Sequence, residues 1–170
     1  MDFSFFKARL ASKAISILPM TSCHGLKSKI LRLAGIQVGK NTQIWSSARF
    51  YGPNIKIGDN CFIGYGVQLF PTKTAAIEIS NGCNIGTDVI IHTGGHHLGP
   101  ATKRTGQGYS KSIFIGDGVR ISTRSIILEG AMVGAGSQIA AGAVVIKDIP
   151  ENTLVGGVPA KIIKTLPPYP

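Results

Sequence analysis

A six-residue repeat occupies most of this chain and restricts its fold more than any other feature. A bulky apolar residue returns at every sixth position within four blocks of sequence. These positions are Val38, Ile44 and Phe50; Ile57, Ile63 and Leu69; Ile79, Ile85 and Ile91; and Ile115, Ile121, Ile127, Val133, Ile139 and Val145. Neither an amphipathic helix, with its period of 3.6, nor a single alternating strand has a strict period of six.

The positions between the apolar residues also follow the repeat. Four residues after most of them stands a small or β-branched side chain: Thr42, Ala48, Cys61, Val67, Cys83, Val89, Val119, Ser125, Ala131, Ser137 and Ala143. Three residues after most of them stands Gly, Asn or Asp, the residue types that tolerate left-handed backbone geometry in turns. Each hexad is therefore predicted to be a short strand followed by a tight turn, with the small residue filling a crowded corner.

Stacked hexads of this kind predict a parallel β-helix, in which each coil buries its apolar residues against its neighbours. Three hexads per coil give about five coils, and a spacing of about 4.8 Å between strands gives a prism roughly 25 Å long. The fold class is thus an all-β solenoid over residues 36–150. An uncovered end would be an open strand edge, so we expect an N-terminal helical segment (1–35) and a short helical C-terminal tail (151–170) to cover the ends.

The N-terminal segment carries most of the positive charge. Residues 1–40 contain seven Lys and Arg against Asp2 alone, which is +6 of the formal +10 of the chain. Apolar residues at helical spacing predict two helices, broken near Pro19 and ended by Gly35: Phe3, Phe6, Leu10, Ala14 and Ile17, then Leu26, Ile30 and Leu33. Two interpretations follow: peripheral contact with an anionic membrane or polysaccharide carrier, or a cap that packs on the domain and exposes its lysines.

Several classes are disfavoured by what the sequence lacks. No helix-turn-helix, zinc or aromatic RNA-binding motif accompanies the charge, so no nucleic-acid partner is expected. Three cysteines without a CxxC pair argue against a disulfide framework or zinc ribbon. Lys7, Arg9 and Lys13 interrupt the first apolar stretch, unlike a secretory signal. We therefore expect a cytoplasmic protein, associated with the inner face of the membrane if the first interpretation of the N-terminal segment holds.

The repeat is interrupted twice. Four extra residues, 71–74, separate two hexads, and 24 positions separate Ile91 from Ile115 where 6 would continue the repeat. The second interruption predicts an extruded loop, residues 93–112, and a long loop on a rigid scaffold is a favoured place for a functional site. Three of the four histidines lie in or beside it: His92, His96 and His97.

The hexads IGDGVR (115–120), VGAGSQ (133–138) and IAAGAV (139–144) resemble those of the hexapeptide-repeat acyltransferases. The stretch AAGAVVIKDIPENTLVGGVPAKIIK (140–164) closely resembles the C-terminal part of the maltose and galactoside O-acetyltransferase group, which includes capsule and O-antigen acetyltransferases. This resemblance implies a left-handed coil and a homotrimer with active sites at subunit interfaces. It also implies acetyl-CoA as donor and a carbohydrate hydroxyl as acceptor, in surface polysaccharide modification.

Direct acetyl transfer to a hydroxyl needs a base, and His has a suitable pKa at neutral pH. No G-x-S-x-G nucleophile motif is present, which favours direct attack without a covalent intermediate. Alignment with the family through the flanking hexads places His96 at the catalytic histidine. His97 is the alternative base, one residue away, and His92 is interpreted as a wall residue or an orienting partner of His96. A carboxylate or a backbone carbonyl must hold the base, and the candidate carboxylates are Glu78, Asp88 and Glu129.

The resemblance also implies the substrate contacts. Tyr109 matches a loop tyrosine of the family and is expected to wall the acceptor pocket. Arg120 stands where relatives often have Trp, so it either binds an anionic acceptor or a CoA phosphate, or it is a solvated surface residue. The residues that match the CoA site are Ser122, Thr123, Ala141, Lys147 and Lys164. Lysines there offer point charges for phosphates.

Two other functions share the scaffold. Streptogramin-type xenobiotic acetyltransferases have a similar loop histidine. Proteins resembling γ-class carbonic anhydrases bind metal with three histidines, one well upstream of an H-x4-H pair. His92 and His97 have that spacing, but the only upstream histidine is His24, in the predicted helices. We therefore expect no metal cofactor.

Overall fold

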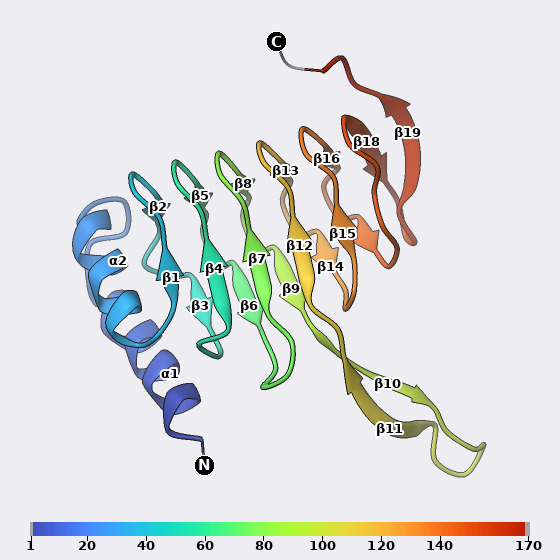
Figure 1. The fold of residues 1–170 in the computed structure, drawn as a ribbon, viewed down its shortest axis with the longest axis horizontal. Helices are drawn as coiled ribbons and strands as arrows, with labels where there is room; N and C mark the ends of the chain where they lie inside the picture. Colours follow the sequence, from blue (N-terminus) through green and yellow to red (C-terminus); the bar gives the residue numbers. More distant parts are fainter. Residues whose placement is uncertain (1, 169–170) are drawn as a thin grey trace.

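The computed structural model describes residues 2–168 as a prism of three parallel sheets, with two helices at one end and a projecting hairpin (Figure 1). The helices are α1 (Phe3–Ser16) and α2 (His24–Leu33), separated near Pro19 as predicted, and Gly35 follows α2 with φ of 90°. Within the described residues, neither helix is long and apolar enough to cross a membrane.

The chain visits the three sheets in turn, one short strand each per coil. Sheet A contains β1 (Gln37–Val38), β4 (Ile55–Ile57), β7 (Ile77–Ile79), β12 (Ile113–Ile115) and β15 (Met132–Val133). Sheet B contains β2 (Gln43–Ile44), β5 (Phe62–Ile63), β8 (Asn84–Ile85), β13 (Arg120–Ile121), β16 (Gln138–Ile139), β18 (Thr153–Gly156) and β19 (Lys161–Thr165). Sheet C contains β3 (Arg49–Phe50), β6 (Gln68–Phe70), β9 (Ile90–His92), β14 (Ile126–Ile127) and β17 (Val144–Val145). This repeating pattern is typical of a left-handed β-helix, and the predicted fold class and number of coils are confirmed.

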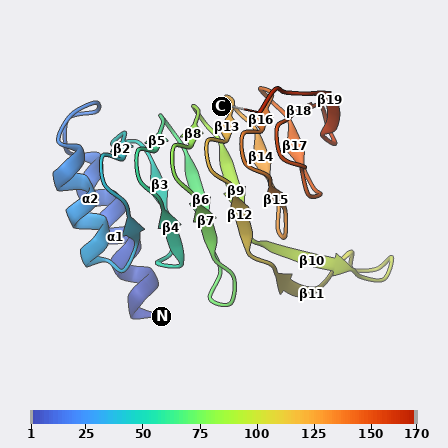
Figure 2. The same ribbon diagram turned by 45° about the horizontal axis from the view of Figure 1, so that its top comes forward.

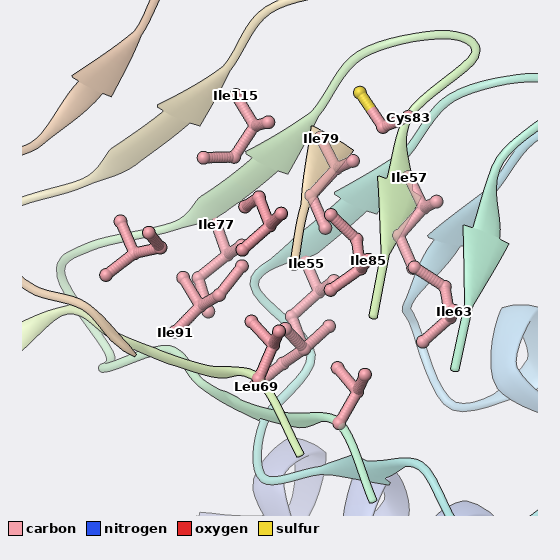
Figure 3. Close-up of a cluster of buried hydrophobic side chains, with 14 of the residues drawn as sticks. Ile55, Ile57, Ile63, Leu69, Ile77, Ile79, Cys83, Ile85, Ile91 and Ile115 are labelled. Carbon is pink, nitrogen blue, oxygen red and sulfur yellow. The ribbon is translucent and has the colours of Figure 1, made fainter. Parts of the chain in front are cut away.

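The core follows the hexads. All fifteen repeat positions and all eleven small residues four positions later are buried. In the middle coils, stacked isoleucines such as Ile57, Ile79 and Ile115 share one side of the interior, and Ile63 and Ile85 another (Figure 3). Since each buried isoleucine contributes about 1.5–3 kcal/mol relative to exposure, the repeat itself accounts for most of the apolar stabilisation.

The turns also have the predicted geometry. Positive φ occurs at nine of the eleven Gly, Asn and Asp turn positions: Asn41, Asn60, Gly66, Gly82, Asp88, Gly118, Gly130, Gly136 and Gly142. Arg124 takes the same position in its hexad with φ of 59°. The side chain of Asp88 lies 3.9 Å from the Arg124 guanidinium, one coil away.

The C-terminal tail is not helical, so that prediction was wrong. The segment forms β18, which continues sheet B beside β16, and β19, which pairs antiparallel with β18. Thr153 and Val155 alternate inward and are buried, whereas every residue of β19 is exposed. The β-branched residues of Lys161–Thr165 favour a strand, and pairing with β18 covers the sheet edge that a helix would leave open.

Candidate active site

The extruded segment is a two-stranded hairpin rather than an irregular loop. Strand β10 (Gly94–Leu98) pairs antiparallel with β11 (Thr105–Ser110), and the hairpin projects away from the prism (Figure 2). It leaves between β9 of sheet C and β12 of sheet A, which we call the C–A corner. The backbone N–H of Gly99 donates to the Arg104 carbonyl and closes the far end at 3.0 Å.

A cleft of about 300 Å³ lies at the base of this hairpin. Its lining residues are Thr72, His92, Gly94, Gly95, His96, Gly108, Tyr109 and Ser110. Thr72 comes from the shorter interruption of the repeat, which leaves the prism at the same C–A corner one coil earlier, between β6 and β7. The two breaks in the repeat therefore meet at one place, and together they build the cleft.

His96 lies in this cleft with an exposed side chain. Its Nδ1 is 3.2 Å from the carbonyl oxygen of Gly106 on the facing strand. A carbonyl only accepts hydrogen bonds, so this contact requires the proton on Nδ1. In the neutral imidazole the lone pair then sits on Nε2, which is the form that a general base needs.

The neighbouring histidines have different surroundings. His97 does not line the cleft, and its ring lies against Tyr109 with centroids 4.5 Å apart. His92 is half-buried, and its Nδ1 is 2.8 Å from the Gly94 carbonyl oxygen at the start of β10. No hydrogen bond joins His92 to His96 within residues 2–168. Of the three histidines, His92 and His96 therefore line the cleft, and His97 does not.

Tyr109 forms the wall behind Gly95. Its hydroxyl donates to Glu129 Oε1 at 2.7 Å, and this hydrogen bond raises the pKa of Tyr109 above its ordinary value. Gly95 lies directly opposite Tyr109 across the hairpin. A Cβ atom at Gly95 would come within 2.6 Å of Glu129 Oε1 and 2.8 Å of Tyr109 Cζ, closer than real Cβ contacts. Glycine at position 95 is therefore required for the Tyr109–Glu129 pair to approach the strand.

None of the three candidate carboxylates holds a histidine in the described part of the chain. Glu129 binds Tyr109, Asp88 faces Arg124, and Glu78 lies on sheet A between Lys56 and Phe114. The groups that meet the histidine rings are backbone carbonyls instead. Thr72, Gly94 and Gly95 also line the cleft, although the sequence had not predicted them there. The paired glycines and the shared corner of the two interruptions are the signals that could have found them.

The structure divides the residues expected to bind CoA among several places. Ser122 and Thr123 follow β13, and Ala141 follows β16, so they stack in consecutive coils at the B–C corner, where the Gly142 N–H donates to the Thr123 carbonyl. Lys147 follows β17 at the C–A corner. The hairpin and His96 also leave from the C–A corner, so the Ser122–Ala141 strip and the cleft lie on different edges of the prism.

The remaining basic residues lie on sheet B. Arg120 is exposed on β13, between Asn84 and Gln138 of the neighbouring strands. Lys164 is exposed on β19 and pairs with Leu154. Both have side chains on the outer side of the sheet, with two strands between them. Neither contacts the hairpin cleft.

No group of three His, Cys, Asp or Glu side chains within residues 2–168 is arranged to hold a metal ion. His24 lies at the start of α2, where its Nδ1 is 3.1 Å from the Ile44 carbonyl oxygen. It therefore belongs to the helical cap, whereas His92 and His97 belong to the hairpin base. This placement gives no support to a γ-carbonic-anhydrase-like site.

Comparison with solved structures identifies the family. A maltose O-acetyltransferase from Clostridium difficile 630 is 30% identical, with a TM-score of 0.70 over 98% of this chain and 90% of that one. The chain belongs to the hexapeptide-repeat acetyltransferases. Within this family it falls in the maltose and galactoside O-acetyltransferase-like group. A galactoside acetyltransferase in complex with coenzyme A superposes with a TM-score of 0.80 at 26% identity, over 98% of this chain and 84% of that one.

A third structural relative is the polySia-specific acetyltransferase NeuO. It is 28% identical with a TM-score of 0.61, over 76% of this chain and 58% of that one. Curated sequence relatives of the hexapeptide-repeat acetyltransferase family are longer, and the chain spans 55–65% of the length of the first four that it matches. No protein-family model matches the chain.

Proposed function

We propose that this chain transfers the acetyl group of acetyl-CoA to a sugar hydroxyl. The observation that carries the proposal is His96 in the hairpin cleft, with Nδ1 held by the Gly106 carbonyl and Nε2 free to accept a proton. The family provides the context, since its members include maltose and galactoside acetyltransferases and one has coenzyme A bound.

In the proposed reaction the sugar hydroxyl attacks the thioester carbonyl carbon directly. His96 Nε2 takes the hydroxyl proton as the new C–O bond forms. The tetrahedral intermediate then collapses, the C–S bond breaks, and the imidazolium returns its proton to the leaving CoA thiolate. Tyr109 and His92 shape the acceptor side of the cleft, and the hydrogen bond to Glu129 holds the Tyr109 hydroxyl in place.

We further propose that the complete site forms between copies of the chain in a homotrimer. Ser122, Thr123 and Ala141 lie at the B–C corner, whereas the His96 cleft lies at the C–A corner. A donor molecule lying along the first corner reaches the histidine of a neighbouring copy when the two corners face each other. Lys147 and Lys164 supply charges for the CoA phosphates, and Arg120 meets either a phosphate or an anionic acceptor.

Surface polysaccharide is the proposed acceptor class, and NeuO supports it as a structural relative whose name specifies a polysaccharide substrate. The reaction is placed in the cytoplasm, which suits the free thiols of Cys23, Cys61 and Cys83.

The test is an acetyl-transfer assay with the purified chain, acetyl-CoA and a panel of acceptors. The panel contains maltose, simple galactosides and oligosaccharides of surface polysaccharides, and products are detected as mono-acetylated sugars by mass spectrometry. Transfer that requires acetyl-CoA and is lost in His96→Asn supports the proposal. Transfer that continues at the wild-type rate in His96→Asn contradicts the assigned base, and hydrolysis of acetyl-CoA with no acetylated sugar contradicts the acceptor class.

A further inference from the structure

The helical cap has two apolar faces, and only one of them packs on the prism. The buried face of α1 consists of small side chains and one isoleucine: Ala8, Ala11, Ser12 and Ile15. Ser12 ties this face to the first coil, because its hydroxyl accepts from the Phe50 N–H at 2.7 Å and donates to the Phe50 carbonyl. The inner face of the helix is therefore fully occupied.

The large apolar residues of the cap point away from the prism. Phe3 is 69% exposed, Leu10 is 55% exposed and Ile17 is 85% exposed, although their spacing is that of a buried helical stripe. Leu26 and Leu33 of α2 continue the exposed set. Between the helices an apolar groove of about 330 Å³ is lined by Lys7, Leu10, Ala11, Ala14, Ile30, Leu33 and Ala34. An apolar surface of this extent marks an interaction site.

Exposed basic side chains lie on the same two helices as this surface. Lys7 lines the groove, and Arg9 and Lys13 of α1 and Lys29 of α2 are exposed. The Arg32 guanidinium is instead held by the first coil, where it donates to the carbonyls of Val38 and Gly39. Lys27 of α2 is buried and has a structural role, because its ammonium donates to the carbonyls of Met20 and Ile44. Burial lowers the pKa of Lys27.

The one acidic residue of this segment does not offset the surrounding charge. Asp2 is the only acid among residues 1–40. Its carboxylate lies 3.4 Å from the ammonium of Lys73, a residue of the first insertion outside the cap. Even this acid is therefore matched by a cation that does not belong to the two helices.

We propose that this surface, the outer face of α1 and α2, docks onto an anionic phospholipid membrane. Aromatic and aliphatic side chains enter the interface between headgroups and acyl chains, and the flanking lysines and arginines meet the lipid phosphates. Charge decides between this occupant and a second copy of the chain, because two such faces would bring like charges together. Large exposed apolar residues decide against an anionic polysaccharide, which offers them no apolar partner.

A second exposed apolar patch serves as an internal control. Phe114 and Met132 of sheet A are 42% and 55% exposed, in a hollow also lined by Asp117, Asp148 and Glu151. Carboxylates line this hollow, whereas exposed lysines and an arginine lie on the two helices of the cap. An anionic membrane should therefore select the helical cap and leave the sheet A patch free.

The experiment is flotation of the full chain with vesicles of phosphatidylcholine, with and without phosphatidylglycerol, at increasing salt. The expected result is binding to the phosphatidylglycerol vesicles that weakens as salt screens the charges. Lys7→Gln/Lys13→Gln should bind about 30-fold more weakly, since each basic residue near such a surface contributes about fivefold. Leu10→Gln/Ile17→Gln should bind at least about tenfold more weakly through loss of apolar burial.

Met132→Gln is the control for the apolar variant, because Met132 and Leu10 are equally exposed. Lys56→Gln/Lys161→Gln is the control for Lys7→Gln/Lys13→Gln, because it changes the net charge equally. Both controls should bind vesicles like the wild type. Absence of flotation with the vesicles that contain phosphatidylglycerol overturns the proposal. The proposal is also overturned if Leu10→Gln/Ile17→Gln binds vesicles like the wild type and is retained on heparin like the wild type. That result would indicate a polyanion partner. A change in molecular mass of that variant by light scattering would instead identify the face as an interface between copies.

Discussion

The prism and the hairpin differ in how they place their side chains. In the prism every sixth side chain points inward and is buried, and the turns repeat from coil to coil. In the hairpin the repeat stops, and His96, His97 and Leu98 are exposed. Burial of the repeat side chains stabilises the prism and keeps them from contact with a substrate. In the hairpin, by contrast, histidine side chains are exposed, and a backbone carbonyl contacts the His96 ring. Stability and chemistry should therefore separate cleanly when each region is altered.

The largest effect is expected at His96. His96→Ala should lower acetyl transfer by at least about 100-fold, because a positioned general base contributes about 10² to 10⁴ in rate. Its melting temperature should match the wild type, since the side chain is exposed. His97→Ala is the matched neighbour and should keep most of the activity. Loss of activity in His97→Ala, with activity kept in His96→Ala, would identify His97 as the base.

The prism should respond in the opposite way. Ile121→Ala removes a fully buried side chain and should lower the free energy of unfolding by about 2–5 kcal/mol. Leu98→Ala, at the 82% exposed hairpin position, should change it by less than about 0.5 kcal/mol. Chemical denaturation measures both. Equal losses would show that the hairpin is part of the cooperative core.

Most of the prism was predictable because the hexad fixes burial and turn geometry together. Ile57, Ile79 and Ile115 lie where a period of six puts them, and Gly82 and Gly118 have the expected positive φ. The β-branched residues of Lys161–Thr165 were a local signal for a strand, but the pairing of the C-terminal strands depends on an open sheet edge that only the folded prism provides.

The predictions for the site were less complete for a related reason. Histidines could be identified in the sequence, but the Gly106 carbonyl that meets His96 depends on strand pairing within the hairpin. Glu129 was one of three candidate carboxylates for holding the base, yet it binds Tyr109. In the cap, helical periodicity picked out Phe3 and Leu10, which face solvent.

A smaller effect is expected inside the hairpin, at Gly95. Gly95→Ala should push Tyr109 and Glu129 apart and lower the rate about tenfold, whereas Gly108→Ala has room, with its nearest atom, His96 Cε1, at 3.6 Å. Steady-state kinetics of both variants test this expectation. A similar loss of rate in Gly95→Ala and Gly108→Ala would indicate that backbone freedom matters at these positions, rather than the Tyr109–Glu129 contact.

The smallest effect is expected at the proposed phosphate contacts. Lys164→Ala should weaken acetyl-CoA binding a few-fold, through loss of one exposed point charge. Lys161→Ala, an exposed lysine on the same strand, should leave the dissociation constant unchanged. Isothermal titration calorimetry with acetyl-CoA distinguishes them, and equal constants for Lys164→Ala and wild type would remove Lys164 from the donor site.

The most direct test of the central claim is the melting temperature of the chain with and without acetyl-CoA, after chelator treatment. A ligand at 100 times its dissociation constant adds about 2.7 kcal/mol of stability, and no acceptor needs to be known. We predict a clear upward shift that survives the chelator. No shift with saturating acetyl-CoA, together with a lower melting temperature caused by the chelator alone, would contradict the transferase and indicate a metal-dependent protein on the same prism.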